Sequence, residues 1–242
     1  ALRDFLAERG QAWLEDPGNA DSRFARGRAR AAAPPVGQAA PDPRPDAGWA
    51  VDHACVVHLS PAPGRRLLAA AVACASGAIA GPRGRVLDRL AHIVREGGVA
   101  TAGGTRIEAG AEILVSRELG RLPPGPLLLS AGQAAVWDGR LEIEAAEPGW
   151  TVAALRGRAA RLSPADRTSL SAVGAAARPA LPVLFRDSGA SPLLAWPGAC
   201  ETVRVRPLVA ARLAGACGLI THERQVGESA VGEAFTPSLS RD

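Results

Sequence analysis

The chain is organised around Trp13-Leu-Glu-Asp-Pro-Gly-Asn-Ala-Asp-Ser-Arg-Phe-Ala-Arg-Gly-Arg-Ala-Arg30, in which two halves of opposite chemistry meet. The first half is acidic, and its Asp16-Pro-Gly-Asn19 segment predicts a turn, because Pro fixes φ while Gly and Asn tolerate positive φ. The second half, from Arg23 to Arg30, carries four arginines and no acidic residue. Asp21 or Ser22 is placed to cap a helix that carries these arginines.

The composition indicates a protein with a sizeable core. The chain has 242 residues, of which 47% are hydrophobic. No apolar run approaches the ~18 residues of a membrane span, and no signal-peptide pattern is present, so we expect a cytoplasmic protein with no membrane partner. All 28 basic residues are Arg. A GC-rich genome explains the total number of arginines, whereas arginines that cluster locally are suited to bind phosphate groups. The cysteines form no Cys-x-x-Cys pair, which predicts free thiols.

The start of the sequence is unusual. The chain contains no Met and opens within a helical pattern at Leu2, Phe5 and Leu6, with no capping residue before it. We therefore expect that the N-terminus is truncated and that a preceding domain is missing.

Periodicity and turn residues predict the elements of the remaining chain. Proline-rich segments at 34–45 and 122–126 predict breaks between modules. We expect helices over 65–76, 82–96, 163–177 and 208–217. The second carries an apolar stripe of Val86, Leu87, Leu90, Ile93 and Val94, and Ser163 caps the third. We also expect a hairpin in which the segments 103–107 and 111–117 flank a turn at 109–110, a second hairpin turn at 138–139, and strands within 50–59, 151–155, 181–185, 192–196 and 203–205. This mixture predicts the α+β class.

The arginines of the opening stretch have two interpretations. On a helix Arg26 and Arg30 share a face that Arg23 continues, whereas Arg28 points elsewhere. Guanidinium groups without carboxylate partners repel one another unless an anion lies on them, so one interpretation is phosphate binding to a nucleic acid or a nucleotide. The other is a solvated basic helix face, which the spacing alone favours.

Two further groups of polar residues are candidate sites. Glu15, Asp16 and Asp21 suit a metal or acid–base chemistry, but capping of the turn and pairing with arginines is favoured. His53-Ala-Cys-Val-Val-His58 offers three zinc ligands, but a strand would place them on opposite faces. The sequence contains no Gly-x-Gly-x-x-Gly, Walker or Gly-x-Ser-x-Gly motif. We therefore expect no metal site and no catalytic residue in this chain.

The opening stretch resembles a motif of the tRNA(Ile)-lysidine synthases, Trp-[Val/Ile]-Glu-Asp-Pro-Ser-Asn-x-Asp-x-x-Phe-x-Arg-x-Arg-x-Arg, which ends their catalytic domain. Later segments follow in an order similar to the C-terminal half of an alphaproteobacterial member. These segments are the hairpin that ends at Arg117-Glu118, Trp137-Asp-Gly-Arg140, Arg178-Pro-Ala-Leu-Pro-Val-Leu-Phe185 and Trp196-Pro-Gly198.

The resemblance assigns roles to five residues of the motif. It implies that Asn19 and Asp21 support the motif, and that Arg26, Arg28 and Arg30 face the catalytic cleft and touch ATP phosphate or the tRNA backbone. It therefore favours binding over a solvated face.

The chain departs from the family pattern in several places. Gly18 replaces the usual Ser, and Gly27 and Ala29 replace bulkier apolar residues. Gly27 weakens a helix by ~1 kcal/mol relative to Ala. The family's Ser-Gly-Gly-x-Asp-Ser loop, which holds ATP, is absent from this sequence.

The resemblance also implies a division of the chain. We expect residues 1–34 to be the C-terminal edge of an ATP-pyrophosphatase-type α/β catalytic domain, 35–48 a linker, 49–128 a tRNA-facing helical module with a β-hairpin, 129–222 a mixed α/β module, and 223–242 a disordered tail.

The family joins lysine to the wobble cytidine of isoleucine tRNA, with ATP converted to AMP and pyrophosphate. The resemblance thus implies isoleucine tRNA, lysine and ATP with Mg²⁺ as partners, with ATP bound mainly by the missing N-terminal domain. It leaves a homodimer open. We expect the fragment to supply tRNA binding and to be inactive alone. The alternatives are a stand-alone RNA-binding or scaffolding protein and a decayed copy.

Overall fold

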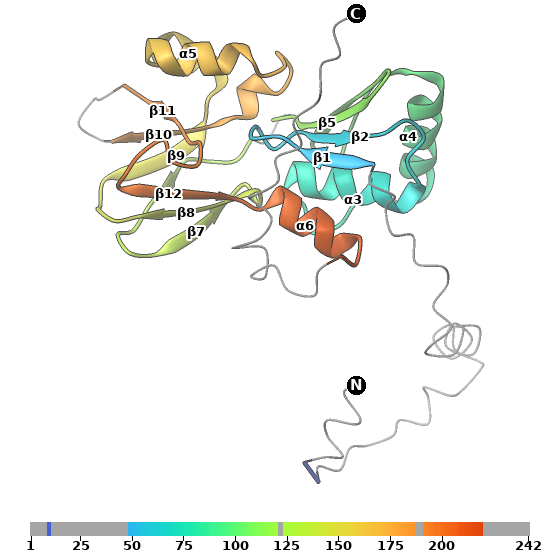
Figure 1. Cartoon of the computed structure of the whole chain (residues 1–242), viewed down its shortest axis with the longest axis horizontal. Coiled ribbons are helices and arrows are strands. Elements are labelled where there is room, and N and C mark those ends of the chain that lie inside the picture. The colour runs from blue at the N-terminus through green and yellow to red at the C-terminus, as the bar shows by residue number, and fades with distance from the viewer. Residues whose placement is uncertain (1–8, 11–47, 121–122, 187–190, 220–242) are drawn as a thin grey trace, which may run out of the picture. The chain divides into compact units, whose positions relative to one another are not determined.

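The computed structural model describes residues 9–10, 48–120, 123–186 and 191–219 (Figure 1). The chain divides into two units, Ala1–Pro43 and Arg44–Asp242, and every helix and strand described here belongs to the second. The motif stretch 13–30 lies outside the described residues, as do the tail 223–242 and most of the expected 1–34 module.

The N-terminal part of the second unit is a five-stranded antiparallel sheet with the strand order β1-β2-β5-β4-β3. Two helices, α3 and α4, connect β2 to β3, and both pack against strands of this sheet. The elements are β1 (Trp49–Val51), β2 (Val57–Leu59), α3 (Arg65–Ser76), α4 (Gly84–Glu96), β3 (Gly98–Ala102), β4 (Thr105–Ala109) and β5 (Ile113–Arg117).

Both helices follow the sequence pattern. Helix α3 has the predicted bounds and ends at Gly77, whose φ of 75° is the left-handed conformation that stops a helix. Helix α4 begins two residues after Pro82 and buries Leu87, Leu90 and Val94, which are three to four positions apart. Most of the predicted apolar stripe is therefore confirmed, while Val86 is exposed.

The strands of this sheet correct the prediction in two places. Gly103 and Gly104 do not begin a strand: with φ of 57° and 77° they form the turn between β3 and β4, where Ala102 pairs with Thr105. The segment 50–59 is two strands joined by a short loop, and β1 pairs with β2. The predicted hairpin of β4 and β5 is confirmed.

The C-terminal part of the unit contains a four-stranded sheet, β11-β10-β9-β6, and a three-stranded sheet, β12-β8-β7. The predicted turn at Asp138-Gly139 is confirmed, with φ of 50° and 63°. Helix α5 begins at the predicted Ser163 cap but ends before the expected residue 177. The elements are β6 (Leu127–Leu128), β7 (Ala134–Trp137), β8 (Leu141–Ala145), β9 (Trp150–Ala154), η2 (Arg156–Arg161), α5 (Pro164–Ser171), η3 (Arg178–Ala180), β10 (Pro182–Arg186), β11 (Leu193–Leu194), β12 (Val203–Pro207) and α6 (Val209–Ala216).

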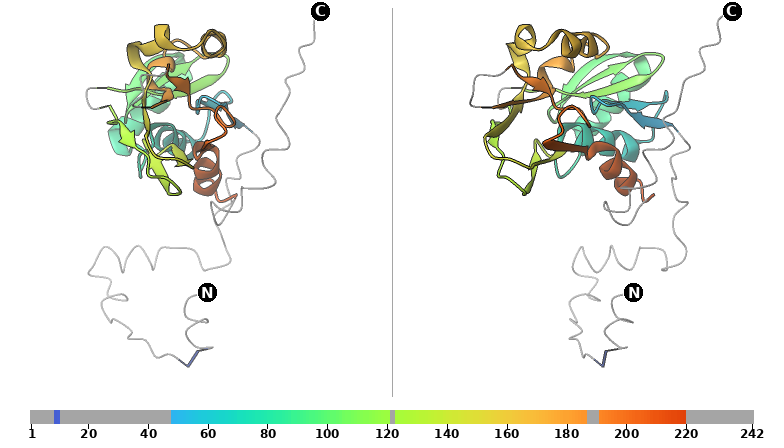
Figure 2. Two further views of the ribbon diagram at one scale, coloured as in Figure 1. Left: turned by 90° about the vertical axis from the view of Figure 1, so that its left-hand side faces the viewer. Right: turned by 60° about the vertical axis from the view of Figure 1, so that its left-hand side comes forward.

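One hydrophobic cluster joins the elements of both parts. It contains Val57 and Val115 from the first sheet, Ile143 from β8 and Leu213 from α6, all with 0% exposed surface. Helix α6 lies beside α3 in Figures 1 and 2. The mixed α+β class is thus confirmed, whereas the module boundary between residues 128 and 129 stays a prediction. No helix in the described part of the chain is long and apolar enough to span a membrane.

Candidate nucleic-acid interface

The residues that the motif singled out cannot be placed. Asn19, Asp21, Arg26, Arg28 and Arg30 all lie outside the described residues. Their roles stay predictions. A second set of arginines lies in the folded unit.

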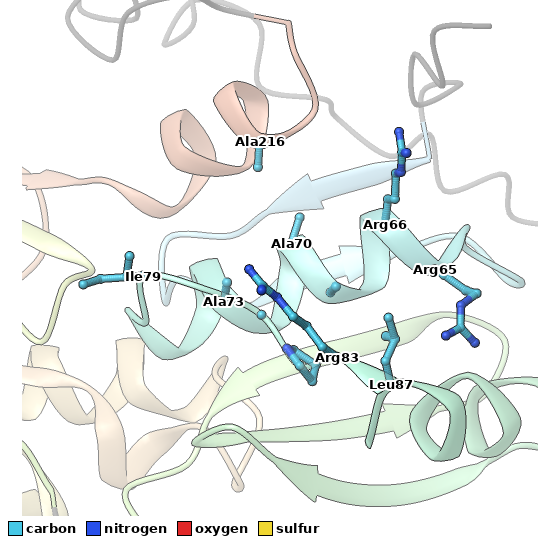
Figure 3. A pocket seen from close by; sticks show the side chains of 11 residues that line it. Arg65, Arg66, Ala70, Ala73, Ile79, Arg83, Leu87 and Ala216 are labelled. Atoms are coloured by element: carbon cyan, nitrogen blue, oxygen red, sulfur yellow. The ribbon is translucent and has the colours of Figure 1, made fainter. Parts of the chain in front are cut away.

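A groove of about 380 Å³ lies between α3, the loop 77–83 and α4 (Figure 3). We call it the α3–α4 groove. Its floor is aliphatic, its edge carries three arginines, and no acidic residue lines it. The lining residues are Arg65, Arg66, Ala69, Ala70, Ala73, Ile79, Gly81, Pro82, Arg83, Leu87 and Ala216.

Gly81 sets the shape of this groove. A Cβ atom on Gly81 would lie 2.1 Å from the carbonyl oxygen of Ala69. The loop backbone therefore rests directly on α3, which only glycine permits. Ile79, which lies in the same loop, is fully exposed and lines the groove. Figure 3 shows Ile79 at one end of the groove, with Arg65 and Arg66 toward the other.

Both helices begin with arginine where the helix dipole favours an anion. Arg65 and Arg66 are the first residues of α3, and Arg83 and Arg85 flank the first residue of α4. Neither helix has an acidic residue in its first turn or a side chain that caps it. The free N–H groups and partial positive charge at each N-terminus add to the guanidinium charge, so a bound anion would relieve the repulsion.

Most of these arginines have no counter-charge among the residues that the structure describes. From residue 60 to 95 the only acidic residue is Asp88, which accepts a hydrogen bond from Arg65. Within the described part of the chain, no hydrogen-bond or ion-pair partner is found for the exposed residues Arg66, Arg83, Arg85 and Arg89. Exposed, unpaired guanidinium groups beside two helix N-termini form a site for phosphate oxygens.

A second basic surface covers η2 and α5, and we call it the η2–α5 surface. Between residues 156 and 178 the only acidic residue is Asp166. Three arginines of this surface donate only to backbone carbonyls, and the exposed Arg156 and Arg161 have no partner among the described residues. The surface consists of Arg156, Arg158, Arg161, Arg167 and Arg178.

The His53–His58 segment is engaged in other contacts. The ring of His53 packs edge-on against Trp196, with centroids 4.9 Å apart. Cys55 is buried. His58 lies between two carboxylates, with Nδ1 3.0 Å from Glu112 Oε2 and Nε2 3.5 Å from Asp52 Oδ2. Among the described residues no group of three His, Cys, Asp or Glu side chains is arranged to hold a metal ion.

Two segments noted in the sequence meet at a buried ion cluster. Arg117 donates from Nε and Nη2 to the two carboxylate oxygens of Asp138, each at 3.0 Å. Arg140 donates from Nε to Asp138 Oδ2 at 2.9 Å and from Nη2 to the carbonyl of Ala180 at 2.8 Å. We call Arg117, Asp138 and Arg140 the Asp138 cluster. Its hydrogen bonds are satisfied internally, so it is a structural junction between β5 and the β7–β8 turn.

Comparison with known proteins gives one informative match. No protein-family model matches the chain, and no solved structure matches it. The tRNA(Ile)-lysidine synthase of Caulobacter vibrioides is 40% identical over 234 residues, which is 92% of this chain and 57% of that protein. This chain is homologous to tRNA(Ile)-lysidine synthase. The resemblance found in the motif is thereby confirmed, and the chain spans a little over half the length of its lysidine synthase relative.

The described residues do not fit the ATP site of a lysidine synthase. They contain no Ser-Gly-Gly-x-Asp-Ser loop and no group of three His, Cys, Asp or Glu side chains arranged to hold a metal ion. The α3–α4 groove offers arginines for phosphate but no aromatic residue for a base. We therefore derive no catalytic step from these residues.

Sequence reasoning missed the groove, although a signal for it was present. Two helices in succession begin with paired arginines and have no acidic residue in the first turn. That pattern is unfavourable for an isolated helix, and an unfavourable pattern that repeats points to an external anion.

Proposed function

We propose that this chain is the tRNA-holding, C-terminal portion of a tRNA(Ile)-lysidine synthase. The observation that carries the proposal is the 40% identity to the Caulobacter enzyme over nearly the whole chain. The Trp13–Arg30 motif and its position in the family support the C-terminal assignment. The α3–α4 groove and the η2–α5 surface supply the charge that an RNA backbone needs.

The two basic surfaces suit a backbone rather than a base. Guanidinium groups bind phosphate oxygens in any sequence context, and no aromatic side chain lines the α3–α4 groove on which an unpaired base would stack. We infer that these surfaces hold and orient the tRNA. Recognition of the wobble cytidine then belongs to the catalytic domain.

In the parent enzyme lysine attacks a cytidine that ATP has activated, and AMP and pyrophosphate leave. Arg26, Arg28 and Arg30 are proposed to touch ATP phosphate or the tRNA backbone at the rim of that site, supported by Asn19 and Asp21. ATP and Mg²⁺ are held mainly outside this chain, lysine and isoleucine tRNA are the other substrates, and the reaction takes place in the cytoplasm.

The test is binding of unmodified isoleucine tRNA to the chain, followed by fluorescence anisotropy at several salt concentrations. The Arg66→Gln/Arg83→Gln variant removes from the groove two charges that have no ion-pair partner in the described part of the chain. We expect its Kd to rise by about 5- to 20-fold and the slope of log K against log salt to fall by about 1.5–2, one phosphate contact per arginine.

The matched control is Arg186→Gln/Arg204→Gln. It removes the same charge from exposed arginines that pair with Glu147 and Glu144. We expect less than a twofold change in Kd. Equal losses of tRNA affinity in both variants would mean that the groove contributes only through the net charge of the protein. Absence of tRNA binding to the unaltered chain would contradict the proposal.

The alternative function is a stand-alone RNA-binding or scaffolding protein. The unpaired arginines of the folded unit favour it equally, because they do not depend on a catalytic parent. The DNA upstream of the codon for Ala1 separates the two: an open frame that encodes Ser-Gly-Gly-x-Asp-Ser supports the synthase. Lysidine formation at a normal rate by this chain alone, with ATP, lysine and tRNA, would contradict the proposal that it lacks catalysis.

A further inference from the structure

The α3–α4 groove has a feature that RNA phosphates do not explain. Its floor is aliphatic: Ala73 and Leu87 are buried there, Ala70 and Pro82 are half-buried, and Ile79 beside them is fully exposed. Exposed aliphatic surface gains nothing from a phosphate backbone. It gains about 25 cal/mol for each Å² that an apolar partner covers. The groove therefore suits a ligand that is both acidic and apolar.

A segment of this chain with that chemistry begins next to the groove. Ala216, the last residue of α6, lines the groove (Figure 3), and the described chain continues to Leu219, which is half exposed. The segment 220–242 starts with the following residue. Few residues are needed to reach the groove, so the entropy lost on docking is small.

The sequence of segment 220–242 alternates acidic and apolar residues. Its acidic residues exceed its basic residues by two: Glu223, Glu228, Glu233 and Asp242 against Arg224 and Arg241. An apolar residue follows each glutamate within three positions, namely Val226, Val231 and Phe235. The glutamates complement the arginine edge of the groove, and the apolar residues complement its floor.

We propose that segment 220–242 docks in the α3–α4 groove and competes there with RNA. The competition, though not the docking, rests on the proposed RNA binding by this groove. Because the segment is tethered, its concentration at the groove is in the millimolar range, and weak contacts suffice for occupancy. RNA displaces it by offering more negative charge, and the segment thereby selects against weak RNA ligands.

The first test measures docking without RNA. Amide hydrogen exchange of residues 66–83 is compared in the full chain and in the Glu223→Gln/Glu228→Gln/Glu233→Gln variant. Loss of docking is expected to speed exchange across the groove by about threefold or more. Unchanged exchange would overturn the proposal. Protection that grows with protein concentration would also overturn it, since the occupant would then come from a second copy.

The second test measures competition by tRNA anisotropy at low salt. We expect the triple variant to bind tRNA about three- to tenfold more tightly than the unaltered chain. The uncharged variant Val231→Ser/Phe235→Ser is expected to shift affinity in the same direction, because it weakens docking without altering charge. Glu201→Gln, an exposed substitution outside the segment, is the control and should leave affinity unchanged.

The outcomes separate the two proposals. Tighter binding in the triple variant alone, with no change in exchange or in the serine variant, would show a general charge effect and overturn docking. Faster exchange in both variants without any tRNA binding would support docking and contradict the proposed RNA function.

Discussion

The guanidinium of Arg117 and the carboxylate of Asp138 form two parallel hydrogen bonds of 3.0 Å across 21 residues of sequence. Arg140 donates to the same carboxylate, and the side chains of Arg117, Asp138 and Arg140 are only 11%, 6% and 2% exposed. Two cations thus share one buried anion. The carbonyl oxygens of Gly104 and Ala180 accept further guanidinium N–H groups, so the cluster holds the first sheet against the β7–β8 turn.

Asp138→Asn should be strongly destabilising, because it leaves two buried guanidinium groups without an anion. Asn tolerates the φ of 50° at this turn, so the backbone is retained. We expect a loss of ~3–5 kcal/mol in the free energy of unfolding, the usual result of breaking a buried pair, measured by urea denaturation. Glu144→Gln breaks the exposed pair with Arg204 and should cost less than ~1 kcal/mol. A small loss for Asp138→Asn would mean that the cluster adds little stability.

Gly77 packs backbone to backbone on the same turn. A Cβ atom on Gly77 would lie 1.8 Å from the carbonyl oxygen of Asp138, and its φ of 75° is left-handed. We expect Gly77→Ala to cost at least ~2 kcal/mol, since strain and overlap add. Gly174→Ala is the control. A Cβ atom on Gly174 would have no neighbouring atom within 4 Å, and the φ of Gly174 lies outside the left-handed region. The stability of this variant should therefore change by less than ~1 kcal/mol. Equal thermal midpoints for the two variants would contradict the packing argument.

The sequence predicted those helices and hairpins that carry a local pattern of apolar and turn residues. Helices α3 and α4 were found because a helical period is followed by glycine, and the hairpin at Asp138 because Asp-Gly selects its turn. Strand β3 was missed because Gly98-Val-Ala-Thr-Ala102 has neither alternation nor bulky β-branched residues throughout. Elements of two residues, such as β6, exist only through their pairing with β9 and have no local pattern.

The sites depend on contacts that no local pattern contains. Arg117 and Asp138 are 21 positions apart in the sequence. The α3–α4 groove forms only where the N-terminal ends of α3 and α4 and the last residue of α6 lie close together in the fold. The chain is similar to a tRNA(Ile)-lysidine synthase, yet the motif residues that carried the resemblance lie outside the described residues. The arginines of the folded unit had therefore to be found by burial, pairing and exposure.

The η2–α5 surface should contribute to RNA binding independently of the groove. Arg156→Gln/Arg161→Gln removes two exposed arginines that have no partner in the described part of the chain. We expect Kd for tRNA to rise by about 5- to 20-fold and the salt slope to fall by about 1.5–2. Combined with Arg66→Gln/Arg83→Gln, the changes in log Kd should add, because the sites share no partner. No effect of the η2 variant would confine the interface to the groove.

Stability should fall in alkaline solution because of one thiol. Burial raises the pKa of Cys55 from its ordinary 9.0 to about 11, with Arg140 opposing the shift only in part. Between pH 9 and 11 the unfolded thiol therefore loses a proton that the folded thiol keeps, and stability decreases by up to ~1.4 kcal/mol per pH unit.

The chain contains neither Lys nor Tyr, and Arg does not titrate in this range. The other cysteines do, among them Cys217, whose pKa burial also raises, so the contribution of Cys55 is obtained by comparison with a variant that lacks it. Unfolding free energies at pH 7.5 to 10.5 are compared for the unaltered chain and Cys55→Ala. The variant loses packing by the same amount at every pH, so a shallower decline above pH 9 isolates the thiol. An equally steep decline in the variant would assign the alkaline loss to another group.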